Sequence, residues 1–189
     1  MFTARPTGIP GCLEIFGPVF NDKRGLFVKT LHADAFSNLG LERNFAEEYY
    51  TFSLPRVLRG LHFQVPPYDH LKIVCCAQGE VMDAVVDLRR GSPTYGKYDI
   101  FRLSPEKGNM VYIPPGLAHG YYVTGTGALM LYKVTTAYSP DHDRGVSWNS
   151  AGIPWPDDSP VVSDRDAGFP TLGEFDSPFV FIPPTGFRP

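Results

Sequence analysis

Short segments in which apolar and polar residues alternate run along most of the chain. Successive side chains of a β-strand point to opposite faces, so alternation over about four to eight residues is typical of a half-buried strand. Glycine, proline, asparagine and aspartate separate these segments at short intervals, as turns between antiparallel strands require. The predicted strands are residues 26–32, 47–54, 70–78, 80–88, 97–103, 109–114, 120–124 and 128–135.

Signals for other elements are few. Gly79 separates two predicted strands and indicates a tight turn. One short helix is predicted over residues 35–41, with Asp34 as its cap. From Pro154 onward the chain is irregular and rich in proline, which predicts extended segments and a short helix packed on the body. The pattern as a whole predicts an antiparallel β-sandwich or barrel.

Composition supports one β-rich domain. Hydrophobic residues make up 43% of the 189 residues and aromatic residues 14%, which suits a pleated, half-buried surface. The 19 glycines and 19 prolines are about a fifth of the chain, against roughly 12% on average, and disfavour a helical bundle. We expect a single domain over residues 1–189, with its core at about 20–170.

Charge and cysteine content exclude several classes of partner. The net charge of −3 gives no electrostatic footprint for nucleic acid or an anionic membrane. No apolar run approaches the ~20 residues that span a bilayer, and the first residues lack a signal-peptide core. Cys12, Cys75 and Cys76 are odd in number and two are adjacent, so we expect buried free thiols and a cytoplasmic protein.

Two histidines lie in unusual settings. His62 occurs in VLRGLHFQVPP and His119 in YIPPGLAHGYYV, both in strand-like segments preceded by a glycine turn. Together with Arg59 and Lys72 they form a cationic and titratable group on strands that should face the interior. Burying such a group requires an anionic partner. The sequence therefore predicts a site for an anion such as a phosphate or pyrophosphate.

A metal site is not expected. The segment around His119 is similar to the second motif of the cupin superfamily, whose metal-binding members carry His-x-His and a later Glu in the first motif. Here Gln64 takes the place of the second histidine, and Lys72 lies where an acidic ligand would be sought. A neutral amide is a poor ligand and an ammonium repels a cation, so we predict no bound metal.

Several segments, in order, carry a further resemblance: FNDKRGLFVKT, VLRGLHFQVPP, GEVMDAVVDLRRGSPTYGKY, YIPPGLAHGYYV, LYKVTTAYSPDHDRGVSWN and VVSDRDAGFP. From about residue 20 to 170 the chain resembles the dTDP-4-dehydrorhamnose 3,5-epimerase family. The resemblance implies a jelly-roll (double-stranded β-helix, cupin) barrel, a homodimer, and no metal or organic cofactor. It also implies epimerisation at C3, C5 or both of a nucleotide-linked 4-keto sugar, in the synthesis of deoxysugar or surface-polysaccharide precursors such as those of lipopolysaccharide.

Four residues match the catalytic set of this chemistry. A base with a pKa near neutral pH must remove a proton next to the 4-keto group, and His62 suits this role. Asp166, in SDRD, matches the family's orienting carboxylate, and its neighbour Asp164 does not. Lys72 is suited to the negative oxygen of the enolate. Tyr132 matches the acid that returns a proton from the opposite face.

Further positions match the substrate-binding residues of the family. Arg24, Arg59 and His119 match residues that bind the pyrophosphate and ribose, and arginine suits bidentate contact with phosphate. Tyr138 matches an aromatic residue beside the nucleotide base, and Phe27 is a weaker candidate for the same stack. The resemblance implies that Arg24 and Phe27 come from the partner subunit.

The chain departs from the family at the nucleotide and outer-sugar end. Lys29 replaces a glutamate, Glu47 and Tyr49 stand where the family has Gln and Asn, and His70 occupies a small or amide-bearing position. Buried polar groups reject analogues that leave them unpaired, so these changes leave the base and the sugar open. Asp83 matches an acidic residue of the barrel interior, either a structural one or one that holds His62 or Lys72.

Two other functions compete with epimerisation. A 3,4-ketoisomerase on the same scaffold would move the carbonyl and need no acid on the opposite face, which Tyr132 disfavours. A non-catalytic sugar-binding cupin would be expected to lose the base or its carboxylate, and both residue types are present. Solvent deuterium uptake next to the carbonyl separates the enzymes from a binding module.

Overall fold

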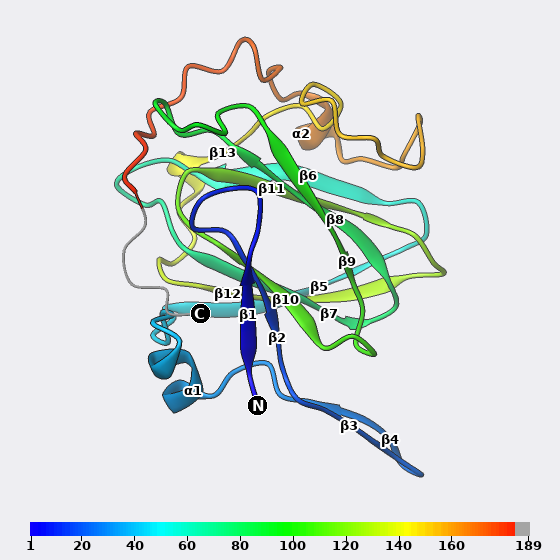
Figure 1. Ribbon diagram of the computed structural model, residues 1–189. Coiled ribbons are helices and arrows are strands. Elements are labelled where there is room, and N and C mark those ends of the chain that lie inside the picture. The colour runs from blue at the N-terminus through cyan, green and yellow to red at the C-terminus, as the bar shows by residue number, and fades with distance from the viewer. Residues whose placement is uncertain (184–189) are drawn as a thin grey trace.

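Residues 1–183 of the computed structural model fold into two antiparallel sheets that face each other (Figure 1). The six-stranded sheet contains, in spatial order, β1 (Thr3–Pro6), β2 (Leu13–Phe16), β10 (Asn109–Ile113), β7 (Lys72–Gln78), β12 (Ala128–Val134) and β5 (Glu47–Ser53). The five-stranded sheet contains β13 (Asp143–Gly145), β6 (Leu58–Gln64), β11 (Leu117–Val123), β8 (Val81–Asp87) and β9 (Tyr98–Leu103). The remaining elements are the hairpin β3 (Val19–Asp22) and β4 (Gly25–Val28), helices α1 (Ala33–Asn38) and α2 (Asp164–Ala167), and the 3-10 turn η1 (Pro140–His142).

Alternation along the central strands separates two hydrophobic layers. Val81 and Val85 of β8 point between the sheets, whereas Ala84 and Val86 point outward. The outward layer is not exposed, because the C-terminal segment covers it with side chains that include Trp155. This segment passes over the five-stranded sheet in Figure 1. Burial on both faces explains why β8 is apolar at five of its seven positions.

The jelly-roll, cupin-type barrel predicted from the sequence is confirmed, as are the turn at Gly79 and the short helix of the C-terminal segment. Cys12, Cys75 and Cys76 are free and buried, as expected. Buried side chains begin at Phe2 and reach Phe179, beyond the predicted core of 20–170, because β2 pairs with β10. No helix of the described chain is long and apolar enough to cross a membrane.

Other boundaries were wrong. Helix α1 begins at Ala33, and its cap is His32, whose Nδ1 accepts a hydrogen bond from the amide of Ala35. The predicted cap Asp34 lies instead in the first turn, where a carboxylate favours the helix dipole. β4 ends at Val28, because the next residues lead into this helix. Strands β1, β2, β3 and β13 were missed, since each has only three or four residues. Strand β6 was not among the predicted strands either, although the segment around His62 was interpreted as strand-like.

A β-bulge interrupts β6 at Gly60. His119 of β11 pairs with His62, but two residues further along β11, Tyr121 pairs with Arg59, so β6 carries one extra residue. Gly60 is therefore inside the strand and is not the turn expected from the sequence. Its φ of +135° suits glycine, and a Cβ there would lie 2.6 Å from the Cα of Gly120. The bulge resets the alternation, so that Arg59 and His62 both face the space between the sheets.

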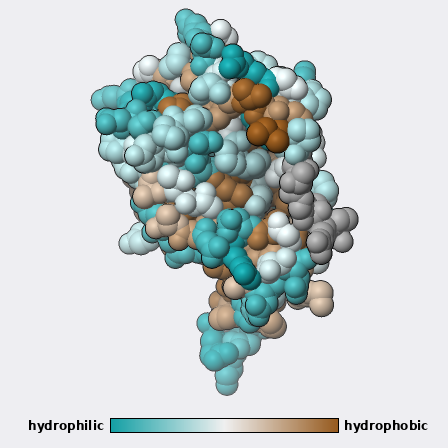
Figure 2. Space-filling model, turned by 90° about the vertical axis from the view of Figure 1, so that its left-hand side faces the viewer, coloured by the Kyte–Doolittle hydropathy of each residue, from teal (hydrophilic) through white to brown (hydrophobic). Residues whose placement is uncertain are grey.

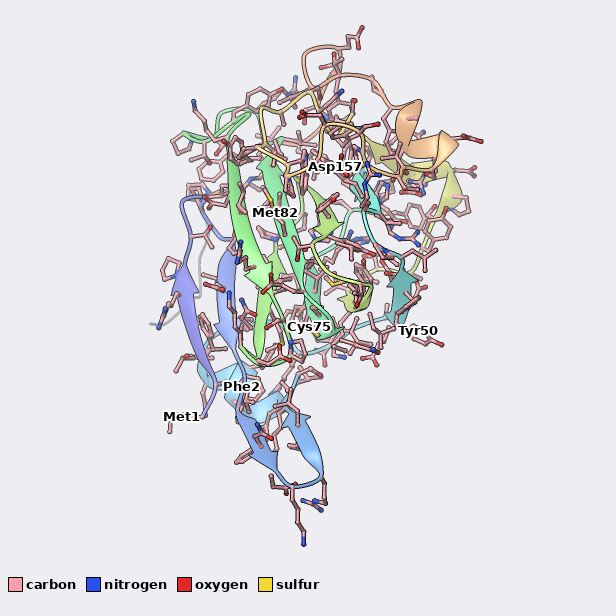
Figure 3. The ribbon with its side chains drawn as sticks, turned by 90° about the vertical axis from the view of Figure 1, so that its right-hand side faces the viewer. Met1, Phe2, Tyr50, Cys75, Met82 and Asp157 are labelled. Atoms are coloured by element: carbon pink, nitrogen blue, oxygen red, sulfur yellow. The ribbon has the colours of Figure 1, made fainter. Side chains whose placement is uncertain are left out.

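The β3–β4 hairpin projects from the body of the molecule (Figures 1 and 2). Its tip is hydrophilic, while Phe20 and Phe27 on its strands pack on each other and remain exposed. Tyr50 and Phe52 of β5 are also exposed, and Figure 3 shows Tyr50 pointing away from the sandwich at its edge. The chain thus presents aromatic side chains on a projecting arm and on an edge strand.

The bulge makes Gly60 a strict requirement of the fold. We expect Gly60→Ala to lower the free energy of unfolding by about 3 kcal/mol or more, because backbone strain and overpacking add. Gly91→Ala is the matched control, since Gly91 also has positive φ but nothing lies within 4 Å of its Cβ position. That variant should lose only about 1–2 kcal/mol. Equal losses in urea denaturation would contradict the assignment of a close backbone approach at Gly60.

Candidate active site

A cavity of about 330 Å³ opens between the two sheets. The residues predicted from the sequence that line it are Glu47, Tyr49, Arg59, His62, Lys72, His119, Tyr132 and Tyr138. Further lining residues come from the same strands and from the segments beside them: Thr51, Phe63, Gln64, His70, Tyr121, Val134, Asp143 and Arg165. The structure therefore gathers most of the predicted site residues around one space.

His62 is held by a carboxylate behind it. Its Nε2 lies 2.9 Å from Oδ1 of Asp166, and the imidazole is 27% exposed. Because a carboxylate accepts, Nε2 carries the hydrogen, and Nδ1 of the neutral ring is left free to accept a proton. The ring of Phe169 packs edge-on against the imidazole and fixes its orientation. His62 is thus arranged as a proton acceptor.

Asp166 joins this histidine to the bulge. Its Oδ2 accepts a hydrogen bond of 3.0 Å from the amide of Gly60, and Ser163 caps helix α2 through the amide of Asp166. Burial acts to raise the pKa of the Asp166 carboxyl, but the hydrogen bonds from His62 and Gly60 outweigh it and lower the pKa. The carboxylate is therefore ionised, which favours the positive charge that His62 gains on taking a proton.

Lys72 lines the cavity and is buried. Burial lowers the pKa of its ammonium from 10.5 to about 8, although the charges of Asp143 and Asp83 act in the opposite direction. Neither carboxylate forms an ion pair with Lys72 within residues 1–183, because each is bound to another side chain. A buried cation without a partner is unfavourable, so the site is better satisfied with a negative oxygen beside Lys72.

Asp83 holds His119, and not His62 or Lys72 as the sequence suggested. Its Oδ2 lies 2.7 Å from Nε2 of His119, and the imidazole is 4% exposed. The register explains the pairing, because β8 and β11 lie side by side and both side chains point inward. Burial lowers the pKa of His119 and raises that of Asp83. The other oxygen of Asp83 has no hydrogen-bond partner among the described residues.

Tyr132 lies on the opposite wall from His62, on β12 of the six-stranded sheet. Its ring stacks on Tyr49 with centroids 4.7 Å apart, and its hydroxyl is 3.3 Å from that of Thr51. Burial raises the pKa of Tyr132 well above 10, and the neighbouring Tyr121 adds to the shift. The phenol is therefore protonated at neutral pH and suited to donate a proton.

A run of hydroxyl groups connects Tyr132 to a cation. From Thr51 the contacts continue to Tyr121 at 3.0 Å and then to Ser53 at 2.8 Å. Ser53 accepts a hydrogen bond of 2.9 Å from Nε of Arg59. Since Arg59 can only donate, this end of the run can orient the hydroxyl protons toward Tyr132.

The outer part of the cavity carries both signs of charge. Tyr138 is exposed there, with its amide donating to Glu47 and its hydroxyl to Asp143. Arg165 pairs with Asp143 at 2.7 Å. The sequence analysis missed Arg165 and Thr51. Arg165 stands in the SDRD segment that supplied Asp166, so a search of that segment for cations would have found it.

Gln64 has a structural role instead of binding a metal. Its Oε1 accepts a hydrogen bond from the amide of Ser139, and its Nε2 donates to the carbonyl of Tyr68. Within residues 1–183, no group of three or more His, Cys, Asp or Glu side chains is arranged to hold a metal ion. Independence from metals and cofactors stays a prediction.

Arg24 and Phe27 do not line this cavity in a single chain. Both are on the projecting hairpin, and the Arg24 side chain is 84% exposed and paired only with Asp22 among the described residues. A role for them in the site requires a second copy of the chain.

A barrel that aims a carboxylate-bound histidine, a lysine and a protonated phenol into one cavity is typical of enzymes that transfer protons. The family model described as dTDP-4-dehydrorhamnose 3,5-epimerase matches residues 6–174. The chain belongs to this family, and it is an isomerase of the epimerase class.

Curated relatives with that description cover most of the chain. The protein of Shigella flexneri is 41% identical over 163 residues, which are 85% of this chain and 90% of the relative. The protein of Pseudomonas aeruginosa is 41% identical over 162 residues, 84% of this chain and 89% of the relative.

Solved structures agree. A dTDP-6-deoxy-D-glucose-3,5-epimerase of Legionella pneumophila, in complex with dTDP-4-keto-L-rhamnose, superposes with a TM-score of 0.87 at 32% identity, over 93% of this chain and 95% of that one. A 3'-monoepimerase of Streptomyces bikiniensis, in complex with dTDP-quinovose, has a TM-score of 0.82 at 31% identity, over 89% and 87% of the two chains.

The burial of Lys72 should be measurable as a penalty on stability. Below pH 8 the folded protein holds a desolvated ammonium, and this penalty disappears as the pH rises from about 8 to 10.5. At pH 7 we expect the free energy of unfolding of Lys72→Met to exceed that of the wild type by up to about 3 kcal/mol. This difference should vanish near pH 10.5. Lys97→Met, at an exposed position, should change stability by less than about 0.5 kcal/mol. A Lys72→Met protein less stable at pH 7 in denaturant titrations would refute the penalty.

Proposed function

We propose that this protein epimerises a dTDP-linked 4-keto sugar at C3, C5 or both. The observation that carries the proposal is the placement of His62 and Tyr132 on opposite sheets across one cavity. Inversion of a carbon needs a base on one face and an acid on the other, and facing sheets about 10 Å apart can contact a sugar ring from both sides. The relatives and the Legionella complex support the nucleotide-linked keto sugar as substrate.

His62 acts as the base through Nδ1, and Lys72 stabilises the negative charge that develops on the sugar. Removing the proton next to the carbonyl leaves an enolate, whose oxygen is stabilised by the buried ammonium of Lys72. Asp166 stabilises the imidazolium that forms, as an ionised carboxylate bound to the far nitrogen. His62 therefore changes its charge without leaving its hydrogen-bonded position.

Tyr132 returns the proton from the other face. Its raised pKa keeps it protonated until the enolate carbon, a strong base, accepts the proton. Donation by Thr51 stabilises the phenolate that remains. A 3,4-ketoisomerase would need no such acid opposite the base.

The other residues position the substrate. Arg59 and Arg165 suit the pyrophosphate, while Tyr138 suits the nucleotide base, with Glu47 and Tyr49 beside them. His119 is more deeply buried than the resemblance implied, which suits contact with the sugar better than with the pyrophosphate. Since a similar solved structure is a 3'-monoepimerase, the carbons inverted stay open. A cytoplasmic location and a role in deoxysugar or polysaccharide precursor synthesis stay predictions.

A homodimer is part of the proposal. The projecting hairpin and the exposed aromatic residues of β5 suit contact with a second copy, which would receive Arg24 and Phe27 at its cavity. Two inactive variants, Arg24→Ala and His62→Ala, test this when mixed and allowed to exchange subunits. About half of the dimers become mixed, each with one intact site, so about a quarter of the wild-type activity should return. No recovery, or an active monomer in light scattering, would refute the shared site.

The roles of His62 and Tyr132 should separate in D2O with a dTDP-4-keto-6-deoxy sugar. His62→Ala should lose both deuterium exchange and inversion, because no proton is removed. Tyr132→Phe keeps the ring stack, so exchange by His62 should persist while inversion falls by about 10² or more. Tyr95→Phe, an exposed tyrosine outside the cavity, is the control and should match the wild type. Unchanged inversion in Tyr132→Phe would show that the acid is another group.

A further inference from the structure

His70 is a half-buried side chain that the proposed mechanism does not use. It lies just before β7 and lines the cavity together with Lys72. Its Nδ1 is 3.1 Å from Nε2 of Gln64. Its Nε2 is buried and has no hydrogen-bond partner within residues 1–183. Leaving a buried polar group unpaired typically costs about 1–3 kcal/mol, so this nitrogen needs an explanation.

The hydrogen bonds of Gln64 determine the tautomer of His70. Gln64 Oε1 accepts from the amide of Ser139, and Nε2 donates to the carbonyl of Tyr68, so the orientation of the amide group is fixed. In its contact with Nδ1 of His70, Nε2 of Gln64 can therefore only be the donor. A neutral imidazole whose Nδ1 accepts carries its hydrogen on Nε2. The unpaired atom of His70 is thus an N–H donor.

This donor carries no charge at working pH. Burial lowers the pKa of His70 from 6.5 to about 3, and the positive charge of Lys72 adds to the shift. Lys72 and His70 therefore offer one ammonium and one neutral donor, so no second cation lies beside Lys72. Such a neutral donor suits an uncharged oxygen acceptor better than a phosphate.

His70 also lines a second, much smaller space. A small chamber of about 10 Å³ adjoins the cavity, with which it shares the lining residues His62, Phe63, Gln64, His70, Lys72 and His119. That volume is close to the minimum for one water molecule. The reacting half of a sugar held by His62 and Lys72 would lie against this chamber.

We propose that His70 is a specificity-determining residue whose Nε2–H binds a hydroxyl group of the sugar in this chamber. The inference rests on the proposed epimerase function and adds a requirement to its substrate. A sugar that lacks the hydroxyl leaves the N–H unpaired in the complex, which should reduce kcat/KM by about 10- to 100-fold. The hydroxyl belongs to a carbon near the carbonyl, at C2, C3 or C6.

The test compares dTDP-4-keto-6-deoxyglucose with its 2-deoxy and 3-deoxy analogues and with its 6-hydroxy counterpart. The readout is kcat/KM for solvent deuterium uptake at either carbon next to the carbonyl. In the wild type, one hydroxyl should contribute about 10- to 100-fold, and the analogue that loses or gains it identifies its position. In His70→Phe this ratio should fall to near one, while His70→Gln, which restores a neutral N–H donor, should recover part of it.

The possible outcomes are distinguishable. Equal kcat/KM for all four sugars in the wild type would mean that a bound water satisfies His70, and would overturn the inference. An unchanged ratio in His70→Phe would also overturn it, as would an equal loss on every sugar, which would place His70 on the carbonyl oxygen common to all. Failure of the proposed function itself is a different result: the wild type would exchange no deuterium with any of the sugars. Thermal unfolding of both variants checks that they fold.

Discussion

The extra residue at Gly60 is the constraint on which the site depends. A regular β6 could not direct both Arg59 and His62 inward, because an odd separation along a strand changes the face. The bulge shifts the alternation of side chains along β6 by one residue, so that both point inward. It also leaves the amide of Gly60 free to donate a hydrogen bond to Asp166. The same carboxylate then orients His62 and anchors helix α2. One irregularity in the backbone thus links the strand, the C-terminal segment and the base.

The two walls of the cavity give their side chains opposite electrostatic tasks. On the five-stranded sheet, a carboxylate holds each of the two histidines: Asp166 holds His62 and Asp83 holds His119. On the six-stranded sheet, Tyr132 is kept protonated by burial, and Lys72 lacks a carboxylate partner among the described residues. In the proposed reaction, the enolate of a keto sugar bound between the two walls would supply the negative charge that this arrangement lacks. The two sheets thus place the proposed base and the proposed acid on opposite walls.

The sequence predicted what local pattern and family motifs encode, and failed where contacts are long-range. Alternation was sufficient for most central strands, though not for β6, and the ordered motifs indicated the residues around the cavity. Nothing local shows that Gly60 is a bulge and not a turn, since this depends on its close approach to Gly120 in another strand. The pairing of Asp83 with His119 depends on the register between β8 and β11. The donor on His70 is defined only by the partners of Gln64, which are brought together by the fold.

Two-sided proton transfer is tested most directly by the origin of the hydrogen at the inverted carbon. A single turnover of the wild-type protein in D2O, with a protiated dTDP-4-keto-6-deoxy sugar, should be analysed by NMR and mass spectrometry. If His62 removes the proton and Tyr132 supplies another, every inverted centre should carry one deuterium from the solvent. Product that retains the hydrogen of the substrate at that centre would mean that a single group serves both faces, and would contradict the assignment of base and acid to opposite sheets.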